Sequence, residues 1–187
     1  GALRPELTVF NAKTLLQDLL EQYAPVAQRR GLQLRMYMRS VYVRSDQRLL
    51  RRVLQNFLAN ALRYTRQGRI VIAGRLKGDQ VEFQVWDSGQ GIPPHHLEQI
   101  YAEFHRYEQS FDWGERGMGL GLSICQRISS LLNHPLKAQS TVGRGSMFSI
   151  GVPIAPKPPT DFASVLPKPS LSQALTGLRV LCLDNDV

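Results

Sequence analysis

Apolar residues recur at helical spacing in the first part of the chain and then switch to alternation. Between Asn11 and Gly31 they return every three or four positions, which predicts an amphipathic helix with Asn11 as its N-cap. In 32–38 and again in 41–43, apolar and polar residues alternate, as they do in half-buried strands. The chain is therefore expected to open with a helix that two short strands follow.

A second helix is predicted after these strands. Ser45 or Asp46 can cap its N-terminus, and helical spacing then lasts to about Tyr64. This helix carries Asn56 and Asn60, which are one helical turn apart and therefore lie on one face. Two amide oxygens placed in this way can approach a metal ion and phosphate groups.

The middle of the chain predicts a β-hairpin. Strand-like runs at 69–75 and 81–86 are separated by Lys77-Gly-Asp-Gln80, which is typical of a tight turn. Asp87 lies at the end of the second strand. An aspartate in this position can accept a hydrogen bond from a ligand.

The remaining elements are a short helix, an irregular segment, a longer helix and a closing hairpin. Two adjacent prolines are expected to open the short helix, which reaches Ile100. The polar, aromatic and glycine-containing stretch 107–116 has no clear period and predicts a mobile lid. A helix with a glycine-rich start is expected over 117–132, and strands over 136–140 and 146–152.

This order of elements predicts an α/β fold, in the form of a two-layer α/β sandwich. Its sheet is expected to be mixed and mostly antiparallel, with three helices covering one face. A chain of 187 residues with 43% hydrophobic content is long enough to fill one core. The order of elements does not fit a doubly wound sheet.

Composition limits the partners that we expect. The net charge of +8 invites a nucleic-acid interpretation, but the arginines, among them Arg29, Arg52 and Arg75, are scattered along the chain. No apolar run approaches the roughly 20 residues that a membrane helix needs. Cys125 and Cys182 have no metal-ligand spacing and indicate no disulfide framework. We expect no nucleic-acid partner, no membrane contact by this sequence and a cytoplasmic location, whether the longer protein is soluble or membrane-anchored.

Two glycine-rich segments complete a candidate nucleotide pocket. The segments Asp87-Ser-Gly-Gln-Gly91 and Gly117-Met-Gly-Leu-Gly-Leu122 allow the backbone to come close to a ligand. A P-loop is excluded because no Gly-Lys is followed by Ser or Thr. A Rossmann fingerprint is excluded because it would need a glycine where Leu122 stands.

In this order the segments resemble the catalytic, ATP-binding domain of a two-component sensor histidine kinase. That domain belongs to the Bergerat-fold (GHKL) ATPases, which include gyrase-type and chaperone-type enzymes. The resemblance runs from about Phe10 to Pro153. Four segments match the N, G1, F and G2 boxes of that family, in this order along the chain: Leu54 to Thr65, Val85 to Pro93, Ile100 to Arg106, and Gly117 to Ile124.

The resemblance implies a site for ATP and Mg²⁺. The residues at matching positions are Asn56, Asn60, Arg63, Tyr64, Asp87, Gly89, Gly91, Ile92, Gly117, Gly119, Leu120, Gly121, Leu122 and Ser146. Asn60 would supply the side-chain ligand of Mg²⁺, and Asp87 would accept a hydrogen bond from the adenine amino group. Arg63 would approach phosphate and the Tyr64 ring would lie against the base, while Ser146 would support Asp87 through its hydroxyl.

Asn56 and Arg106 are the candidate catalytic residues. Arg106 matches an arginine that can reach the γ-phosphate and neutralise the charge that develops during transfer. Asn56 stands where the chaperone and gyrase relatives carry a glutamate that activates water, and an amide cannot accept that proton. The four histidines lie in no phosphoacceptor motif, and we expect surface or structural roles for them: His95, His96, His105 and His134.

The resemblance also implies the domain organisation. Residues 1–9 would lead from a dimerisation and phosphoacceptor domain, 10–153 would be the catalytic domain, 154–177 a proline-rich linker, and 178–187 the first strand of a truncated receiver domain. The expected partners are the upstream dimerisation helices, the receiver domain that follows the linker, and a downstream response regulator. The acidic pair of the receiver reads Asp184-Asn185, which leaves metal binding there open.

The function implied is that of a hybrid histidine kinase. The domain would bind Mg-ATP and donate the γ-phosphoryl group to a histidine on a dimerisation domain that lies outside this sequence. An alternative is a nucleotide-gated interaction module, in which ATP binding controls contacts with neighbours and no phosphoryl group is transferred. A hydrolytic ATPase would need a base that position 56 does not supply.

Overall fold

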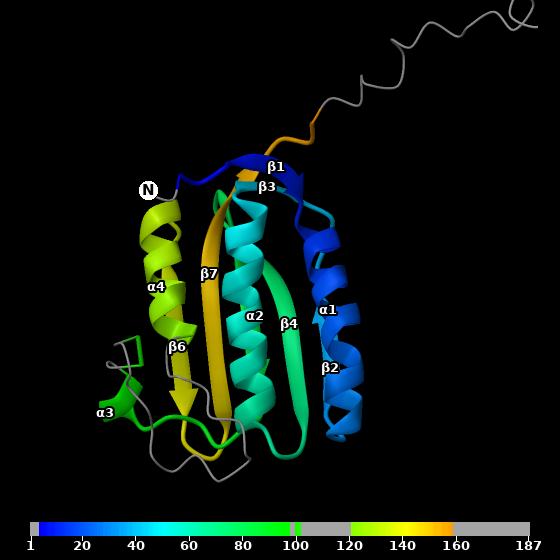
Figure 1. The fold of residues 1–187 in the computed structure, drawn as a ribbon, viewed down its shortest axis with the longest axis vertical. Helices are drawn as coiled ribbons and strands as arrows, with labels where there is room; N and C mark the ends of the chain where they lie inside the picture. Colours follow the sequence, from blue (N-terminus) through cyan, green and yellow to red (C-terminus); the bar gives the residue numbers. More distant parts are fainter. Residues whose placement is uncertain (1–3, 98–99, 102–120, 159–187) are drawn as a thin grey trace, which may run out of the picture. The chain divides into compact units, whose positions relative to one another are not determined.

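Helices cover one face of a sheet in the computed structural model, which describes residues 4–97, 100–101 and 121–158. Three helices lie on that face (Figure 1): α1 (Ala12–Arg29), α2 (Gln47–Tyr64) and α4 (Gly121–Leu132). The helix α3 (Pro94–Leu97) is a single turn beside the sheet. The predicted two-layer α/β sandwich is confirmed.

The sheet of the described part is mixed and mostly antiparallel. Its strands are β1 (Thr8–Asn11), β2 (Gln33–Tyr37), β3 (Tyr42–Ser45), β4 (Arg69–Lys77), β5 (Gln80–Asp87), β6 (Leu136–Thr141) and β7 (Gly145–Ala155). They are arranged in the order β1-β3-β7-β5-β4-β2, and β6 pairs with the free side of β7. The pair β2–β4 is parallel, while β5 and β7 run antiparallel with Asp87 opposite Ser146.

The core lies between the helices and the sheet. On β5 the alternate residues Val81, Phe83 and Val85 face inward and are almost fully buried. Phe57 of α2 is also buried and stacks on Phe148 of β7, with ring centroids 5.6 Å apart. Burial of an aromatic side chain of this size stabilises a fold by roughly 1.5–3 kcal/mol. The helix that carries the two candidate asparagines is thus fixed to the central strands.

The N-terminus of α2 is capped by Asp46, one of the two residues predicted to do so. Its Oδ1 accepts hydrogen bonds from the N–H groups of Arg48 (3.0 Å) and Leu49 (3.1 Å), and its Oδ2 accepts one from Glu6 (2.9 Å). Burial disfavours the charged form, but these donors outweigh it and lower the pKa of Asp46. The cap therefore fixes the start of α2 and also holds the N-terminal segment.

Two strands differ in extent from the sequence expectations. The strand β1 begins at Thr8, within the stretch 1–9 that was expected to be a lead, and pairs with β3. The strand β7 continues to Ala155, because Val43 and Tyr42 of β3 pair with Ile154 and Ala155. The first two residues assigned to the linker therefore belong to the sheet. The lid 107–116, the start of the helix expected at 117, and the receiver-like segment 178–187 lie outside the described residues.

A buried hydrogen bond links β3 to the turn between α4 and β6. Ser45 Oγ lies 2.9 Å from His134 Nε2, and both residues are buried. His134 has the structural role expected from the sequence. Burial lowers the pKa of its imidazole, although the neighbouring Asn133 backbone partly opposes this. The folded protein therefore favours the neutral ring.

We predict that protonation of His134 destabilises the fold. Because the folded pKa lies below the ordinary value of about 6.5, the free energy of unfolding should be fully present above that pH and fall as the pH decreases below it. Chemical unfolding between pH 8 and pH 5 measures this dependence. His134→Gln should flatten the pH profile, whereas the matched change at the exposed His95 should not. An unaltered profile in His134→Gln would contradict the assignment.

Candidate functional site

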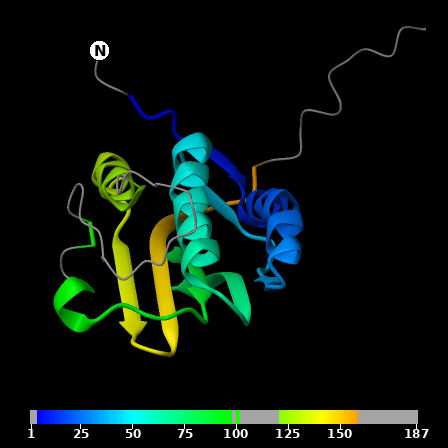
Figure 2. The same ribbon diagram turned by 60° about the horizontal axis from the view of Figure 1, so that its bottom comes forward.

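The predicted site residues that the structure describes gather at one end of the sheet. Asp87 ends β5, Ser146 lies opposite it on β7, and Gly121 begins α4. Figure 2 shows this end, where the segment from β5 to α3 passes the ends of β6 and β7. Here β5, β6, β7 and α3 are close in space although they come from separate parts of the sequence.

The Asp87 carboxylate is held by two backbone groups. Its Oδ1 accepts hydrogen bonds from the N–H of Gly89 (2.8 Å) and from the N–H of Ser146 (3.3 Å). Within the described residues no donor reaches Oδ2. Burial raises the pKa of Asp87, and the two N–H donors only partly oppose this. One oxygen is thus fixed by backbone N–H groups, and the other has no donor among the residues that the structure describes.

Two glycines in the loop after β5 are required by close backbone packing. A Cβ at Gly89 would collide with the carbonyl oxygen of Tyr64 at the end of α2. A Cβ at Gly91 would collide with the backbone of Thr141, and Gly91 also has a positive φ of 72°. The loop therefore lies directly against α2 on one side and the β6–β7 turn on the other.

The Asn56 side chain extends from α2 toward the first turn of α4. A Cβ at Gly121 would lie 3.2 Å from Asn56 Oδ1, so the amide packs against the start of α4. The thiol of buried Cys125, one turn into α4, donates to the carbonyl of Val53 (3.9 Å), and burial raises its pKa to about 12 although the neighbouring Asn56 side chain partly opposes this. Asn56 therefore connects the two helices. Asn60, one turn further along α2, is partly exposed, and no described residue hydrogen-bonds its amide.

Arg63 and Tyr64 occupy the last turn of α2, where the predicted basic and aromatic positions lie. The Arg63 guanidinium carbon is 5.7 Å from the centroid of the Tyr64 ring, within the range of a cation–π contact. Arg30, the residue that caps the C-terminus of α1, donates a hydrogen bond to the carbonyl of Leu62 (2.7 Å), which holds this end of α2. Because the carbonyl oxygen of Tyr64 lies against Gly89, this last turn of α2 is next to the loop that follows Asp87.

Ser146 supports Asp87, but through a different group from the one predicted. Its backbone N–H reaches the carboxylate, while its hydroxyl is 3.0 Å from the hydroxyl of Ser140. Ser140 in turn accepts a hydrogen bond from Ile92 N–H at 2.7 Å. Ser140 could not be identified from the sequence, because nothing in its local pattern distinguishes it from other strand serines.

Several predicted site residues cannot be placed in this geometry. Arg106, Gly117, Gly119 and Leu120 lie outside the described residues. Gly121 and Leu122, which follow them, form the first turn of α4 and are partly exposed. The N-terminus of this helix lies beside Asn56, near the middle of α2, and points toward the end of the fold that carries Asp87 (Figure 1).

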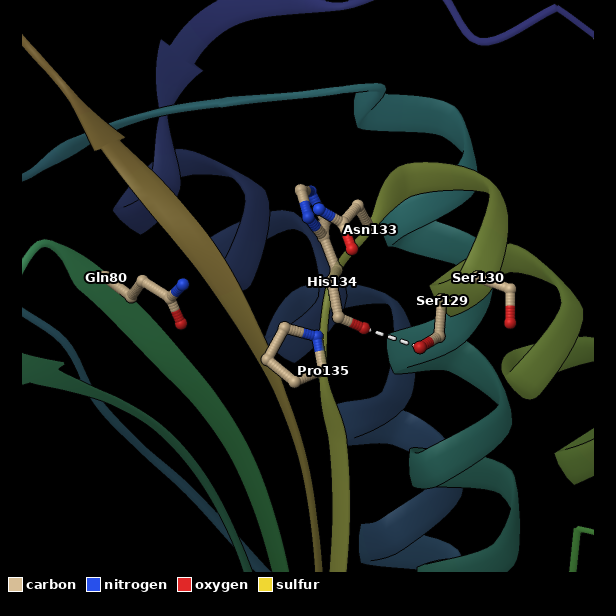
Figure 3. A pocket seen from close by; sticks show the side chains of 6 residues that line it. All are labelled: Gln80, Ser129, Ser130, Asn133, His134 and Pro135. Carbon is tan, nitrogen blue, oxygen red and sulfur yellow. Dashed lines mark hydrogen bonds between the residues drawn. The ribbon is translucent and has the colours of Figure 1, made fainter.

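A surface pocket of about 470 Å³ lies elsewhere (Figure 3). Its lining comes from Gln80, from the last turn of α4 at Ser129 and Ser130, and from the turn between α4 and β6 at Asn133, His134 and Pro135. Gln80 begins β5, whereas Asp87 ends it. The pocket is therefore at the opposite end of the sheet and contains none of the predicted site residues.

The described residues contain no group of three or more His, Cys, Asp or Glu side chains that could hold a metal ion. Among the helices that the structure describes, none is both long enough and apolar enough to cross a membrane.

Comparison with known proteins gives consistent matches to one group. Residues 45–156 match the family model described as histidine kinase-, DNA gyrase B-, and HSP90-like ATPase. The circadian input-output histidine kinase CikA of Thermosynechococcus vestitus is 32% identical over 169 residues, which cover 88% of this chain and 23% of the relative. Hybrid signal transduction histidine kinase B of Dictyostelium discoideum is 37% identical over 118 residues, or 60% of this chain and 6% of the relative.

Solved structures agree with this grouping. Full-length ShkA in complex with AMPPNP is similar with a TM-score of 0.75 and 26% identity, covering 84% of this chain and 33% of that one. The catalytic domain of histidine kinase ThkA is similar with a TM-score of 0.70 and 25% identity, covering 81% of this chain and 99% of that one. The chain spans less than a quarter of the length of the two curated relatives.

We predict that Asp87→Asn stabilises the fold. The amide retains an oxygen for the Gly89 and Ser146 N–H groups but removes a charge whose burial is unfavourable. Because the folded pKa is raised, the wild-type chain loses stability as the pH rises from about 4 through that pKa. Urea unfolding should therefore show the variant to be more stable at pH 7 and no more stable near pH 3.5. Equal stability at both values would show that the carboxylate is not strained by burial.

Proposed function

Because the chain belongs to the family of histidine kinase-, DNA gyrase B- and HSP90-like ATPases, we propose that the end of the sheet around Asp87 binds ATP. The observation that carries this proposal is the half-buried carboxylate with one oxygen fixed by backbone N–H groups. Its other oxygen accepts a hydrogen bond from the adenine amino group. Guanine presents a carbonyl oxygen at that position, and two acceptors facing each other repel.

The loop and helix ends around Asp87 form the rest of the adenosine site. Gly89 and Gly91 keep the loop close to α2 and to the β6–β7 turn, so that Ile92 lines the base pocket. The Tyr64 ring lies against the base, and Arg63 approaches phosphate. The helix α4 begins at Gly121 and Leu122, directly after Gly117, Gly119 and Leu120 in the sequence. Backbone N–H groups at such a helix start favour phosphate.

Mg²⁺ fits the oxygen donors at this site. Asn60 would supply an amide oxygen that no described residue engages, and the nucleotide and solvent would supply the other oxygen ligands that Mg²⁺ prefers. When bound, the ion neutralises phosphate charge.

The reaction that fits these residues is transfer of the γ-phosphoryl group to a histidine nitrogen on a dimerisation domain outside this sequence, with ADP as the leaving group. Asn56 packs against Gly121 and Cys125 and offers no carboxylate to deprotonate water, which disfavours hydrolysis. Arg106 stabilises the charge that develops during transfer. A receiver domain after the linker and a separate response regulator would receive the phosphoryl group in a cytoplasmic pathway.

We predict that Asp87→Ala weakens Mg-ATP binding by about 1–3 kcal/mol, because the adenine amino group loses its acceptor. Calorimetric titration of Mg-ATP and Mg-GTP measures this. The parent should prefer ATP, and the variant should lose most of that preference. Asp79→Ala, a change at an exposed turn residue, serves as the control and should bind like the parent. Undiminished ATP affinity in Asp87→Ala would refute the proposed site.

We also predict that this chain binds Mg-ATP without phosphorylating itself. His134 is buried with its Nε2 hydrogen-bonded to Ser45, and His95 and His96 lie on the short helix α3 rather than in an acceptor motif. Incubation with γ-labelled ATP followed by mass spectrometry should find no stoichiometric phosphohistidine. Stoichiometric label on His95 or His105 would contradict the assignment of the acceptor to another domain.

A further inference from the structure

Ser140 of β6 is the meeting point of three segments at the candidate adenine pocket. Its Oγ accepts a hydrogen bond from the N–H of Ile92 at 2.7 Å and donates one to the carbonyl of Gly145 at 3.0 Å. The hydroxyl of Ser146 lies 3.0 Å from the same atom. Ser140 is partly buried and lies directly opposite Ser146 in the β6–β7 pairing.

These three contacts fill the hydrogen-bonding capacity of the hydroxyl. A serine hydroxyl has one proton to donate and two lone pairs to accept. Since the proton goes to Gly145, the lone pairs accept from Ile92 N–H and from the Ser146 hydroxyl. The direction of all three hydrogen bonds is therefore determined. The Ser146 hydroxyl therefore donates its proton to Ser140. It has no proton left for Asp87, which Ser146 contacts through its backbone N–H instead.

The Ile92 contact is one of two that fasten the loop after β5 to the β6–β7 end. The other is a hydrogen bond from Gly143 N–H to the carbonyl of Gln90 at 2.8 Å. Between these two points the backbone of Gly91 lies against Thr141 with no room for a Cβ. The second half of the loop, residues 90–92, is thus held in place by β6 and β7.

We propose that Ser140 is a positioning residue that sets the adenine selectivity of the site through its hydroxyl. It fixes the loop at Ile92, and it fixes the start of β7 at Gly145 and Ser146. Both N–H donors to Asp87 Oδ1 belong to these segments, since Gly89 is in the loop and Ser146 is in β7. Ser140 therefore determines the direction in which Asp87 presents its second oxygen. This inference rests on the proposed ATP site.

The isosteric pair Ser140→Thr and Ser140→Val isolates the hydroxyl. Both replacements are β-branched and suit a strand, and they differ only in whether the hydroxyl is present. Ser149→Ala is the matched control, because Ser149 is a buried serine of β7 whose hydroxyl donates to Glu82 at 3.3 Å, near the middle of the sheet. Calorimetric titration with Mg-ATP and Mg-GTP gives the affinity and the selectivity, and amide exchange at Ile92 reports the loop contact directly.

The valine variant should bind Mg-ATP on the order of tenfold more weakly than the threonine variant, the usual effect of leaving a buried polar group unpaired. Its preference for ATP over GTP should also fall, and the Ile92 amide should exchange faster. Ser149→Ala should lower the unfolding midpoint without changing selectivity, as expected of a purely structural serine.

Equal ATP affinity and equal ATP-to-GTP preference in the two isosteric variants would overturn the proposed role of Ser140. Asp87→Ala, measured in the same titrations, separates this result from failure of the premise. If Asp87→Ala loses affinity while the isosteric pair does not differ, only the role of Ser140 fails. If neither change affects binding, the nucleotide site itself is wrongly placed and both proposals fail.

Discussion

The site depends on a carboxylate that is partly removed from water yet held by only two backbone donors. Asp87 is the last residue of β5, so the antiparallel pairing with β7 brings Ser146 N–H to the same oxygen that Gly89 N–H contacts. Burial outweighs these donors, and the pKa of Asp87 is raised. A ligand that donates to the second oxygen would complete the hydrogen bonding of the carboxylate and relieve this cost.

The packing around this carboxylate explains why separate parts of the chain form one site. The core contact of Phe57 with Phe148 fixes α2 over the central strands, and the end of α2 then lies against Gly89. On the other side, Ser140 and Gly143 fasten the loop to β6 and β7. The loop has little freedom of its own. Its geometry is determined by a helix end and a strand pair that come from distant parts of the sequence.

Much of the fold followed from periodicity, because the long elements bury one clear face. Strand β1 was missed since it is short, lies at the sheet edge and leaves its apolar residue Val9 exposed, so no buried alternation marks it. The extension of β7 to Ala155 depends on pairing with β3, a long-range contact that local pattern does not reveal. Asp87 and the glycines could be selected from their motif, and the structure brings the described ones together. Ser140 could not, because its importance comes from three partners that only the folded chain assembles.

The most direct test of the central claim is the pKa of the Asp87 carboxyl group, measured by carbon-13 NMR titration with and without a non-hydrolysable Mg-ATP analogue. Without nucleotide, the pKa should lie above the ordinary aspartate value of about 3.9. With nucleotide bound, the adenine amino group should stabilise the charged form and lower the pKa. A pKa that the saturating analogue leaves unchanged would contradict the account, because it would mean that Asp87 does not contact the bound base.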